Sequence, residues 1–289
     1  MKLSIITINR NNASGLLRTI ESVVSQTWKD FEYIVIDGAS SDESVDVIKR
    51  YESSITTWLS EADTGIYNAM NKGIRRASGE YCLFLNSGDF LVDEQALERV
   101  FSHDFSADIA LFSLINTDRE KSYCRRPPSK ITLYTFLQGD LSHPSSFIRR
   151  SLFLSIGYYN EKYRIISDWC FFVDALILHN VSYARFDDVV SVFDRSGVSI
   201  STNGGDIISE EKRDYLIRRF PRVWEDYNIP EYCSNSIFYL CKDAPIVLRF
   251  LFLFPLRILN RLLKLRNRLG RKLSVEKIYY NFFDKEIKL

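Results

Sequence analysis

Phe31-Glu-Tyr-Ile-Val-Ile-Asp37 is an apolar run that ends in an aspartate, and Glu80-Tyr-Cys-Leu-Phe-Leu-Asn-Ser-Gly-Asp89 ends in the same way. Each apolar run predicts a buried strand. Ligands of parallel sheets gather outside the carboxyl ends of the strands, where a carboxylate can hold a base, a ribose or a cation on phosphates. Asp37 and Asp89 therefore predict a nucleotide-diphosphate site, here without a P-loop motif.

Strands and helices alternate through the first hundred residues around these two runs. Further strands are predicted at Leu3–Ile8 and Ile55–Leu59, and helices through Leu16 to Val24, through Val45 and Ile48, and over Thr64–Ala77. The alternation predicts an α/β fold with a mixed, mainly parallel, Rossmann-like sheet and helices on both faces.

The regular alternation of strands and helices ends after Asp89. A strand is predicted at 108–115, a loop at Lys121–Lys130, a strand at His143–Arg149 and a helix capped by Ser167. We predict a catalytic domain over 1–205 and a helical, basic, amphipathic extension over 206–289.

Composition fits a globular intracellular protein. The chain has 289 residues, of which 46% are hydrophobic, enough for a sizeable core. Its 5 cysteines form no CxxC pair, which favours free thiols in a reducing compartment over a zinc site or disulfides. The first residues run directly into a strand and show no signal peptide, so we expect a cytoplasmic protein.

Polar residues beside the predicted strand ends supply candidate nucleotide contacts. The turn after the first strand, Thr7-Ile-Asn-Arg-Asn-Asn12, either meets a nucleotide or forms a polar cap. Gly38-Ala-Ser-Ser-Asp42 suits close approach to a ribose, and equally an ordinary turn. In Glu61–Lys72, Asp63 is a ligand contact or a helix cap. The predicted donor contacts are Thr7, Asn9, Asn11, Asp37, Ser40, Asp63, Asn71, Lys72 and Ser87.

Asn86-Ser-Gly-Asp89 is a candidate cation site, with a strand-terminating turn as the alternative. A hard divalent ion commonly takes one or two carboxylates and completes its shell with phosphates and water. The predicted metal ligand is Asp89.

The candidates for chemistry on an acceptor lie further along the chain. Asp168 begins a predicted helix, where it complements the helix dipole or acts as a general base on an acceptor hydroxyl. Trp169 stacks on a sugar or belongs to the core. His143 contacts phosphate or metal on the acceptor side, or is structural.

Taken in order, these stretches resemble family 2 glycosyltransferases of the GT-A fold. The resemblance covers about residues 1–200 and rests on Ser4–Asn9, Glu21–Gln26, Tyr33–Asp42, Asp63–Gly73, Ala77–Tyr81, Asn86–Asp89, His143–Arg149, Ile156–Asn160 and Ser167-Asp168. Any one of these pieces is a weak signal, whereas the ordered set is specific.

The resemblance implies an inverting, hexosyltransferase-like enzyme that uses a nucleotide-diphosphate sugar, with a UDP-sugar as the expected donor and Mn²⁺ or Mg²⁺ as cofactor. Asp37 would contact the uracil or ribose, Asp89 would stand in the Asp-x-Asp position, and Asp168 would be the catalytic base. The metal motif offers Ser-Gly-Asp where relatives carry paired aspartates. No Gln-x-x-Arg-Trp motif of the processive synthases is present, which favours transfer of a single sugar.

The end of the chain is basic. Eight Lys and Arg residues and no acids lie between Arg249 and Lys272, although the whole chain has a net charge of +1. Basic residues interleaved with apolar ones suit a helix on an anionic membrane surface, so we expect 245–272 to bind the inner face of the cell membrane. Its alternative is a helical cap packed on the body. Nucleic acid is disfavoured as a partner, because the charge is confined to this tail.

A membrane-associated enzyme suggests a lipid-linked saccharide acceptor in bacterial surface-polysaccharide biosynthesis. Two alternatives remain open. The first is a catalytically silent relative that binds sugar nucleotides or acts as a membrane scaffold. The second is a nucleotidyltransferase, which the lack of a Gly-rich basic loop after the first strand disfavours.

Overall fold

The computed structural model describes residues 1–117, 122–194 and 204–223. Contacts divide the chain into two compact units, Met1–Tyr215 and Leu216–Leu289. The described part of the second unit is 216–223, in which the Phe220 N–H donates to the Leu216 carbonyl. The predicted boundary at 205/206 stays a prediction, and the predicted membrane-binding stretch 245–272 lies outside the described residues. No helix among the described residues is long and apolar enough to cross a membrane.

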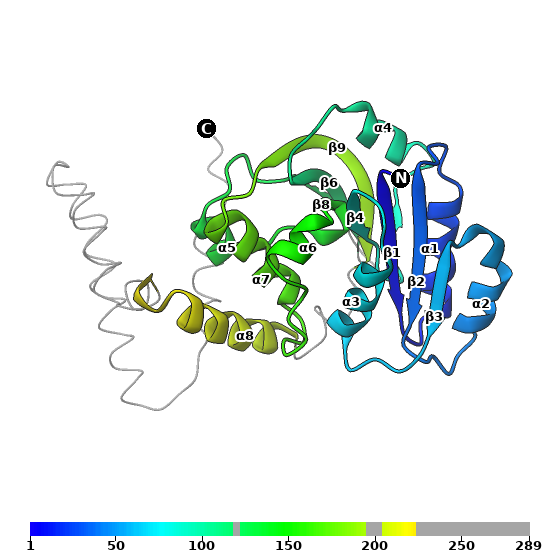
Figure 1. The fold of residues 1–289 in the computed structure, drawn as a ribbon, viewed down its shortest axis with the longest axis horizontal. Coiled ribbons are helices and arrows are strands. Elements are labelled where there is room, and N and C mark those ends of the chain that lie inside the picture. Colours follow the sequence, from blue (N-terminus) through cyan, green and yellow to red (C-terminus); the bar gives the residue numbers. More distant parts are fainter. Residues whose placement is uncertain (118–121, 195–203, 224–289) are drawn as a thin grey trace, which may run out of the picture. The chain divides into compact units, whose positions relative to one another are not determined.

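One nine-stranded mixed sheet forms the centre of the first unit, in the order β3-β2-β1-β4-β8-β6-β9-β5, with β7 paired to β6 (Figure 1). Its strands are β1 (Leu3–Asn9), β2 (Phe31–Asp37), β3 (Thr57–Ser60), β4 (Tyr81–Phe84), β5 (Phe90–Leu91), β6 (Ile109–Thr117), β7 (Ser122–Arg125), β8 (Ser146–Arg149) and β9 (Tyr183–Asp194).

The parallel part of this sheet holds the strands that the sequence singled out. β1 pairs in parallel with β2 on one side and with β4 on the other, and Asn9 is the register partner of Asp37. β8 then runs antiparallel to β4. The carboxyl ends of β1, β2 and β4 therefore meet at one edge, and the predicted mixed sheet is confirmed.

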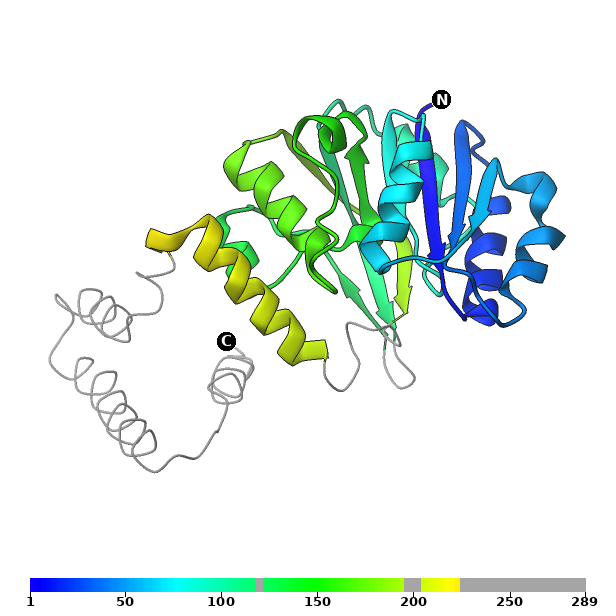
Figure 2. The ribbon, with the colours of Figure 1, turned by 60° about the horizontal axis from the view of Figure 1, so that its bottom comes forward.

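Helices cover both faces of the sheet (Figures 1 and 2). The α-helices are α1 (Ala13–Val24), α2 (Ser44–Arg50), α3 (Ile66–Arg76), α4 (Ala96–Ser102), α5 (Leu133–Gln138), α6 (Ser151–Ser155), α7 (Ser167–Val173) and α8 (Gly204–Arg219). Short helical turns lie at Glu52–Ser54 and His143–Ser145, and a π-helical turn at Asp174–Leu178 extends α7.

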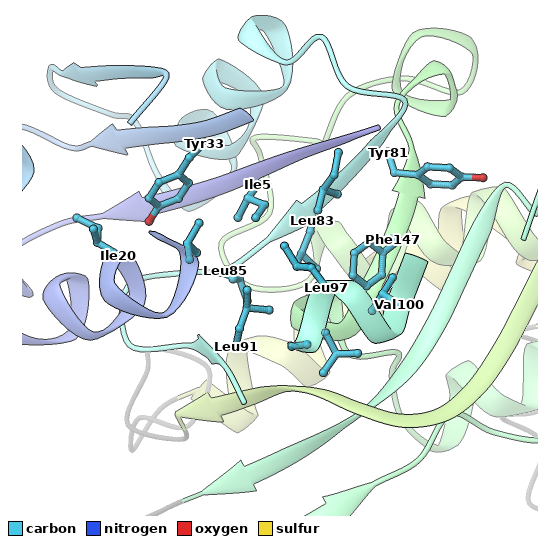
Figure 3. Close-up of a cluster of buried hydrophobic side chains, with 14 of the residues drawn as sticks. Ile5, Ile20, Tyr33, Tyr81, Leu83, Leu85, Leu91, Leu97, Val100 and Phe147 are labelled. Atoms are coloured by element: carbon cyan, nitrogen blue, oxygen red, sulfur yellow. The ribbon is translucent and has the colours of Figure 1, made fainter. Parts of the chain in front are cut away.

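Strand alternation decides which side chains meet which helices, because successive residues point to opposite faces. One face of β1 and β2, with Ile5 and Tyr33, packs in a buried cluster with Ile20 of α1 and Leu97 of α4 (Figure 3). On the other face, Ile6 packs against Gly73 of α3, where a Cβ would lie 2.4 Å from Ile6 Cγ2. Gly73 therefore lets α3 approach the sheet closely, which offsets its low helix propensity.

Two elements of the second half were not predicted. β7 lies within the predicted loop at Lys121–Lys130, and its exposed or half-exposed residues give no apolar signal. α5 is a single short helix over Leu133–Gln138. Ser167, predicted to cap α7, is instead its first residue after Ile166, and its buried Oγ has no hydrogen-bond partner.

Candidate active site

The turn Asn86–Asp89 is held against β1 and α1. Backbone N–H groups of Leu85 and Ser87 donate to the carbonyls of Ile6 and Ile8, so the chain follows β1 beyond the end of β4. Gly88 then adopts φ +111°, which side chains other than glycine rarely tolerate. Thr19 Oγ1 accepts from the Gly88 N–H and lies 2.7 Å from the Asp89 carbonyl. These contacts fix where the Asp89 side chain begins.

Two cavities adjoin this turn and share Asn12, Ile66, Tyr67, Asn86 and Ser87 as lining residues. The first, which we call the acid cavity, has a volume of about 430 Å³ and is lined also by Asp89, Asp140, Asp168 and Asp194. The second, the amide cavity, has a volume of about 670 Å³ and is lined also by Asn9, Asn11 and Asp63. The shared wall makes the two cavities parts of one site.

Asp168 is held in the acid cavity by two side chains from distant segments. His143 Nδ1 lies 3.2 Å from Asp168 Oδ2, and the Tyr67 hydroxyl lies 2.7 Å from Asp168 Oδ1. The Tyr67 hydroxyl also contacts the carbonyl of Ile165. His143 Nε2 lies 3.2 Å from Asn86 Nδ2, so the imidazole contacts Asp168 through one ring nitrogen and the Asn86 amide through the other. The carboxylate of Asp168 is therefore oriented as well as buried.

These contacts also set the charges. Burial alone would raise the pKa of Asp168, but His143, Tyr67 and the Trp169 backbone N–H lower it. Burial would lower the pKa of His143, whereas Asp168 and the more distant Asp89 raise it. Burial and the Asp168 charge raise the pKa of Tyr67, which stays a proton donor. At neutral pH the cavity thus presents an ionised Asp168.

Asp89 has the opposite environment. Its Oδ1 accepts from the Asp194 backbone N–H at 3.0 Å, but its Oδ2 is buried and has no hydrogen-bond partner. Burial raises the pKa of Asp89 to about 7, although His143 and the Asp194 backbone N–H act to lower it. The buried Asn86 Oδ1, on the same turn, also lacks a partner. Unmatched buried oxygens cost free energy, so both are poised to accept from a ligand.

Asp37, which was predicted to touch the nucleotide, lies behind the amide cavity with 0% exposure. Its carboxylate accepts from Asn9 Nδ2, from the Ser40 backbone N–H and Oγ, and from Ser60 Oγ at 2.5–2.9 Å. Burial would raise the pKa of Asp37, but these hydrogen bonds lower it. Asp37 thereby orients Asn9, whose Oδ1 is buried without a partner beside the cavity.

Four of the predicted donor contacts, Asn9, Asn11, Asp63 and Ser87, line the amide cavity. The other five do not line it. Asp37 and Ser40 stand behind Asn9 and Asn11. Thr7 is buried against the Tyr33 hydroxyl, and Asn71 bonds the backbone of Tyr159.

Lys72 supports the amide cavity through an ion pair. Its Nζ lies 2.5 Å from Asp63 Oδ1 and 2.9 Å from Glu61 Oε1. Burial would lower the pKa of Lys72, but these two carboxylates raise it. Asp63 therefore does not cap α3, which begins after Gly65.

His143 and Trp169, the predicted acceptor contacts, both line the acid cavity. Trp169 is only 2% exposed, and its Nε1 donates to the carbonyls of Phe136 and Gly139. Lys212 Nζ lies 4.7 Å from the centre of its ring. The core alternative therefore describes Trp169 in this structure better than a free stacking surface does.

Several residues in or next to the acid cavity had no signal in the sequence. Arg18 Nη2 pairs with Asp194 Oδ2 at 2.6 Å, across a separation of 176 residues. Lys212 comes from α8, and Arg125 from β7. Tyr67, in contrast, had a local signal, as a polar residue in the first turn of α3. No group of three or more His, Cys, Asp or Glu residues among those described forms a metal cluster.

Comparisons with known proteins identify relatives of this chain. Residues 4–165 match the model of the family described as "Glycosyl transferase family 2". An uncharacterized glycosyltransferase of Mycobacterium tuberculosis is 34% identical over 230 residues, which are 76% of this chain and 85% of the relative. A "PGL/p-HBAD biosynthesis glycosyltransferase" of Mycobacterium bovis is 32% identical over 174 residues, 58% of this chain and 67% of the relative.

A solved structure has a fold similar to that of this chain. The crystal structure of S. aureus TarS 1-349 in complex with UDP-GlcNAc superposes with a TM-score of 0.59 and 17% sequence identity. The superposition covers 84% of this chain and 74% of TarS 1-349.

Proposed function

The chain belongs to glycosyl transferase family 2, and we propose that it transfers a single sugar, with inversion, from a UDP-sugar to a hydroxyl of a saccharide acceptor. The observation that carries the proposal is the carboxylate of Asp168, ionised and oriented by His143 and Tyr67 in a cavity that adjoins a second, amide-lined one. This arrangement supports a general base beside a cavity that could take a nucleotide.

Asp168 is the proposed catalytic base. It removes the proton of the acceptor hydroxyl as that oxygen attacks the anomeric carbon, from the face opposite the departing diphosphate. Holding both carboxylate oxygens at fixed partners keeps the base in one orientation and reduces the entropic cost of the reacting geometry. His143 and Tyr67 are positioning residues in this scheme, because they act through Asp168.

The amide cavity is the proposed donor site. Its buried Asn9 Oδ1 lacks a partner and matches an N–H donor such as that of a uracil ring. Asn11 and Ser87 add neutral polar groups on the same wall. TarS, of similar fold, has been crystallised with UDP-GlcNAc, which supports a nucleotide-sugar donor of this kind.

A divalent cation, Mn²⁺ or Mg²⁺, is part of the proposal, and the residues present fit it. Asp89 would hold it through Oδ2, whose lack of a partner is unusual for a buried carboxyl oxygen. Since no cluster of three ligands is found among the described residues, donor phosphates and water would complete the shell. When bound, the ion would neutralise charge that develops on the departing diphosphate.

The acceptor and the location are the least constrained parts of the proposal. We propose a lipid-linked saccharide, and a peripheral position on the inner face of the membrane through 245–272, outside the described residues. The mycobacterial relative named for PGL/p-HBAD biosynthesis supports a role in a biosynthetic glycosyl transfer.

Hydrolysis of a panel of UDP-, GDP- and dTDP-sugars with Mn²⁺ or Mg²⁺ tests the proposal, with membrane extract as acceptor in a second arm. We expect release of one nucleoside diphosphate, reduced by at least about 100-fold in Asp168→Asn. Asp187→Asn, an exposed aspartate outside both cavities, is the matched control and keeps full activity.

The alternative of a catalytically silent relative predicts a different outcome. It predicts that UDP binds, that no donor of the panel is hydrolysed in either arm, and that Asp168→Asn behaves as wild type. Release of pyrophosphate in place of sugar transfer would support the nucleotidyltransferase.

A further inference from the structure

Lys212 is a cation without a counter-ion in the acid cavity. It comes from α8, is only partly exposed and lies over the Trp169 ring. One hydrogen bond joins its Nζ to the Gly139 carbonyl at 3.0 Å. No carboxylate of the described residues lies within 4.0 Å of its Nζ, and burial lowers its pKa. An ammonium in this position has donors left for a ligand.

The acids of the same cavity are already engaged. Asp168 faces His143, Asp194 pairs with Arg18, and Asp140 pairs with Arg125. Asp89 accepts at Oδ1 from the Asp194 backbone N–H, and its Oδ2 has no hydrogen-bond partner among the described residues. None of these four carboxylates directly neutralises Lys212, so the cost of burying its charge is only partly offset.

Arg125 adds a second cation to the same wall. Its Nη2 reaches both the backbone carbonyl and the carboxylate of Asp140. Its Nε and Nη1 have no hydrogen-bond partner among the described residues. Lys212 and Arg125 line the acid cavity, which contains Asp168, but not the amide cavity. Their unused donors therefore lie on the side of the proposed base and not with the proposed nucleotide site.

We propose that Lys212, with Arg125, forms an acceptor subsite for an anionic oxygen group, a carboxylate or a phosphate ester, on the saccharide that receives the sugar. The inference rests on the proposed function, because it assigns an acceptor to the cavity of Asp168. Lys212 covers the ring of Trp169, so the acceptor meets the ammonium at the place where the sequence predicted stacking on the indole.

Equilibrium binding, measured without turnover, tests this subsite. The full-length protein is saturated with UDP, and ligand-observed NMR compares methyl glucuronide and methyl glucoside 6-phosphate with the neutral methyl glucoside. We expect at least one of the two anionic probes to bind about tenfold more tightly than the neutral methyl glucoside. The carboxylate and phosphate arms show which source of negative charge the subsite accepts.

Variants of α8 assign that preference to one residue. Lys212→Met keeps the aliphatic packing on Trp169 and is expected to reduce the preference to twofold or less. Lys212→Arg keeps the charge and is expected to retain it. Arg213→Met, at an exposed neighbouring position, is the control and leaves it unchanged. Thermal unfolding confirms that each variant is folded.

Two results would overturn the subsite. One is equal binding of neutral and anionic probes to the wild type. The other is a Lys212→Met variant that loses affinity for UDP while its preference among the saccharides persists, which would place Lys212 at the donor diphosphate. Failure of the proposed function gives a different pattern, namely absence of sugar transfer in the donor panel with these binding preferences intact.

Discussion

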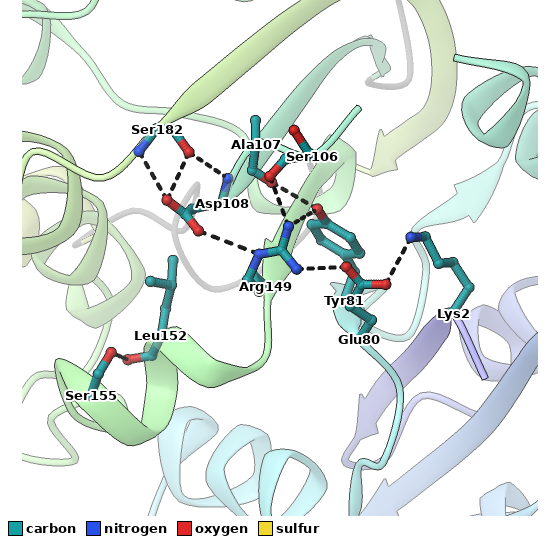
Figure 4. Close-up of polar contacts among 10 residues, drawn as sticks. All are labelled: Lys2, Glu80, Tyr81, Ser106, Ala107, Asp108, Arg149, Leu152, Ser155 and Ser182. Atoms are coloured by element: carbon teal, nitrogen blue, oxygen red, sulfur yellow. Dashed lines mark hydrogen bonds and ion pairs between the residues drawn. The ribbon is translucent and has the colours of Figure 1, made fainter. Parts of the chain in front are cut away.

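The two ends of the central strands differ in whether their buried polar groups have hydrogen-bond partners. At the amino end of β4, Glu80 pairs with both Lys2 and Arg149, and Arg149 also reaches Asp108 and the Tyr81 hydroxyl (Figure 4). At the carboxyl end, buried oxygens of Asn9, Asn86 and Asp89 have no partner.

The same strands supply both ends, so strand geometry does not explain the difference. Glu32, near the start of β2, shows the closed arrangement, since its Oε1 accepts from Ser4 Oγ and from the backbone N–H groups of Ser78 and Gly79. Satisfied polar groups stabilise the fold, whereas unsatisfied ones cost stability and remain available to a ligand. The comparison predicts that the amino end contributes mainly to stability, and that the unpartnered oxygens at the carboxyl end serve a ligand.

Among the variants that test this comparison, Asp89→Asn is expected to show the largest effect, on activity. The substitution removes the carboxylate at the carboxyl end of the central strands, and we expect kcat/KM for sugar transfer to fall by about 100-fold. The hydrogen bond that Oδ1 accepts from Asp194 is retained, so the free energy of unfolding changes by less than about 1 kcal/mol. Steady-state kinetics and urea unfolding measure the two. Retained activity would show that the carboxyl end does not serve catalysis.

Glu32→Ala tests the closed end and should affect stability alone. It leaves the donors of Ser4, Ser78 and Gly79 buried without their acceptor, at a cost of about 3 kcal/mol in the free energy of unfolding. We expect kcat/KM at 20 °C to stay within about twofold of wild type, since each class of group acts at its own end. Glu32→Gln, which keeps an acceptor oxygen, is the control and should cost less. Loss of activity in a folded Glu32→Gln protein would contradict the comparison.

Arg149→Met should have a smaller effect on stability. Arg149 is partly exposed, which weakens each ion pair through solvent screening, but it connects Glu80, Asp108 and Tyr81. We expect the free energy of unfolding to fall by about 1–2 kcal/mol. Lys29→Met, at an exposed lysine that bonds only a backbone carbonyl, is the control. Equal losses in the two variants would show that the closed network adds nothing beyond a surface charge.

The smallest expected effect is a pH dependence of the Glu32 contribution. Burial would raise the pKa of Glu32, but its hydrogen bonds to Ser4, Ser78 and Gly79 lower it below the unfolded value of 4.5. A lowered carboxyl pKa stabilises the fold above pH 4.5, and this stabilisation is lost as the pH falls through the folded pKa. The difference in unfolding free energy between wild type and Glu32→Gln should therefore shrink on acidification below pH 4.5. A difference that grows in acid would reverse the sign of the argument.

The first half of the fold was predictable because its pattern is local. Apolar runs of β1, β2 and β4 and the apolar stripe of α1 appear in adjacent residues, and the structure confirms these elements. β7 was missed because it is an edge strand whose side chains are largely exposed. For such a strand, pairing with β6 decides the conformation and burial does not.

The sequence predicted the acidic residues of the site but not the side chains that contact them. Asp89 and Asp168 were singled out from their positions after a strand and at a helix start. The contact of His143 with Asp168 joins segments 25 residues apart, and His143 was expected to touch phosphate or metal instead. Arg18 with Asp194 and Lys212 over Trp169 join still more distant segments.

The sequence by itself determined the family, the mixed α/β architecture and the acids at the strand ends, because periodicity and short motifs are encoded in neighbouring residues. Tertiary structure alone decided that Asp37 accepts hydrogen bonds from four donors, whereas Asp89 keeps one oxygen without a hydrogen-bond partner. It also decided that Lys212 lines the cavity of Asp168. The physical reason is that the hydrogen bonds and the desolvation of a side chain depend on the groups that pack around it. Many of these groups are distant in the sequence, so only the folded structure determines which of them make contact.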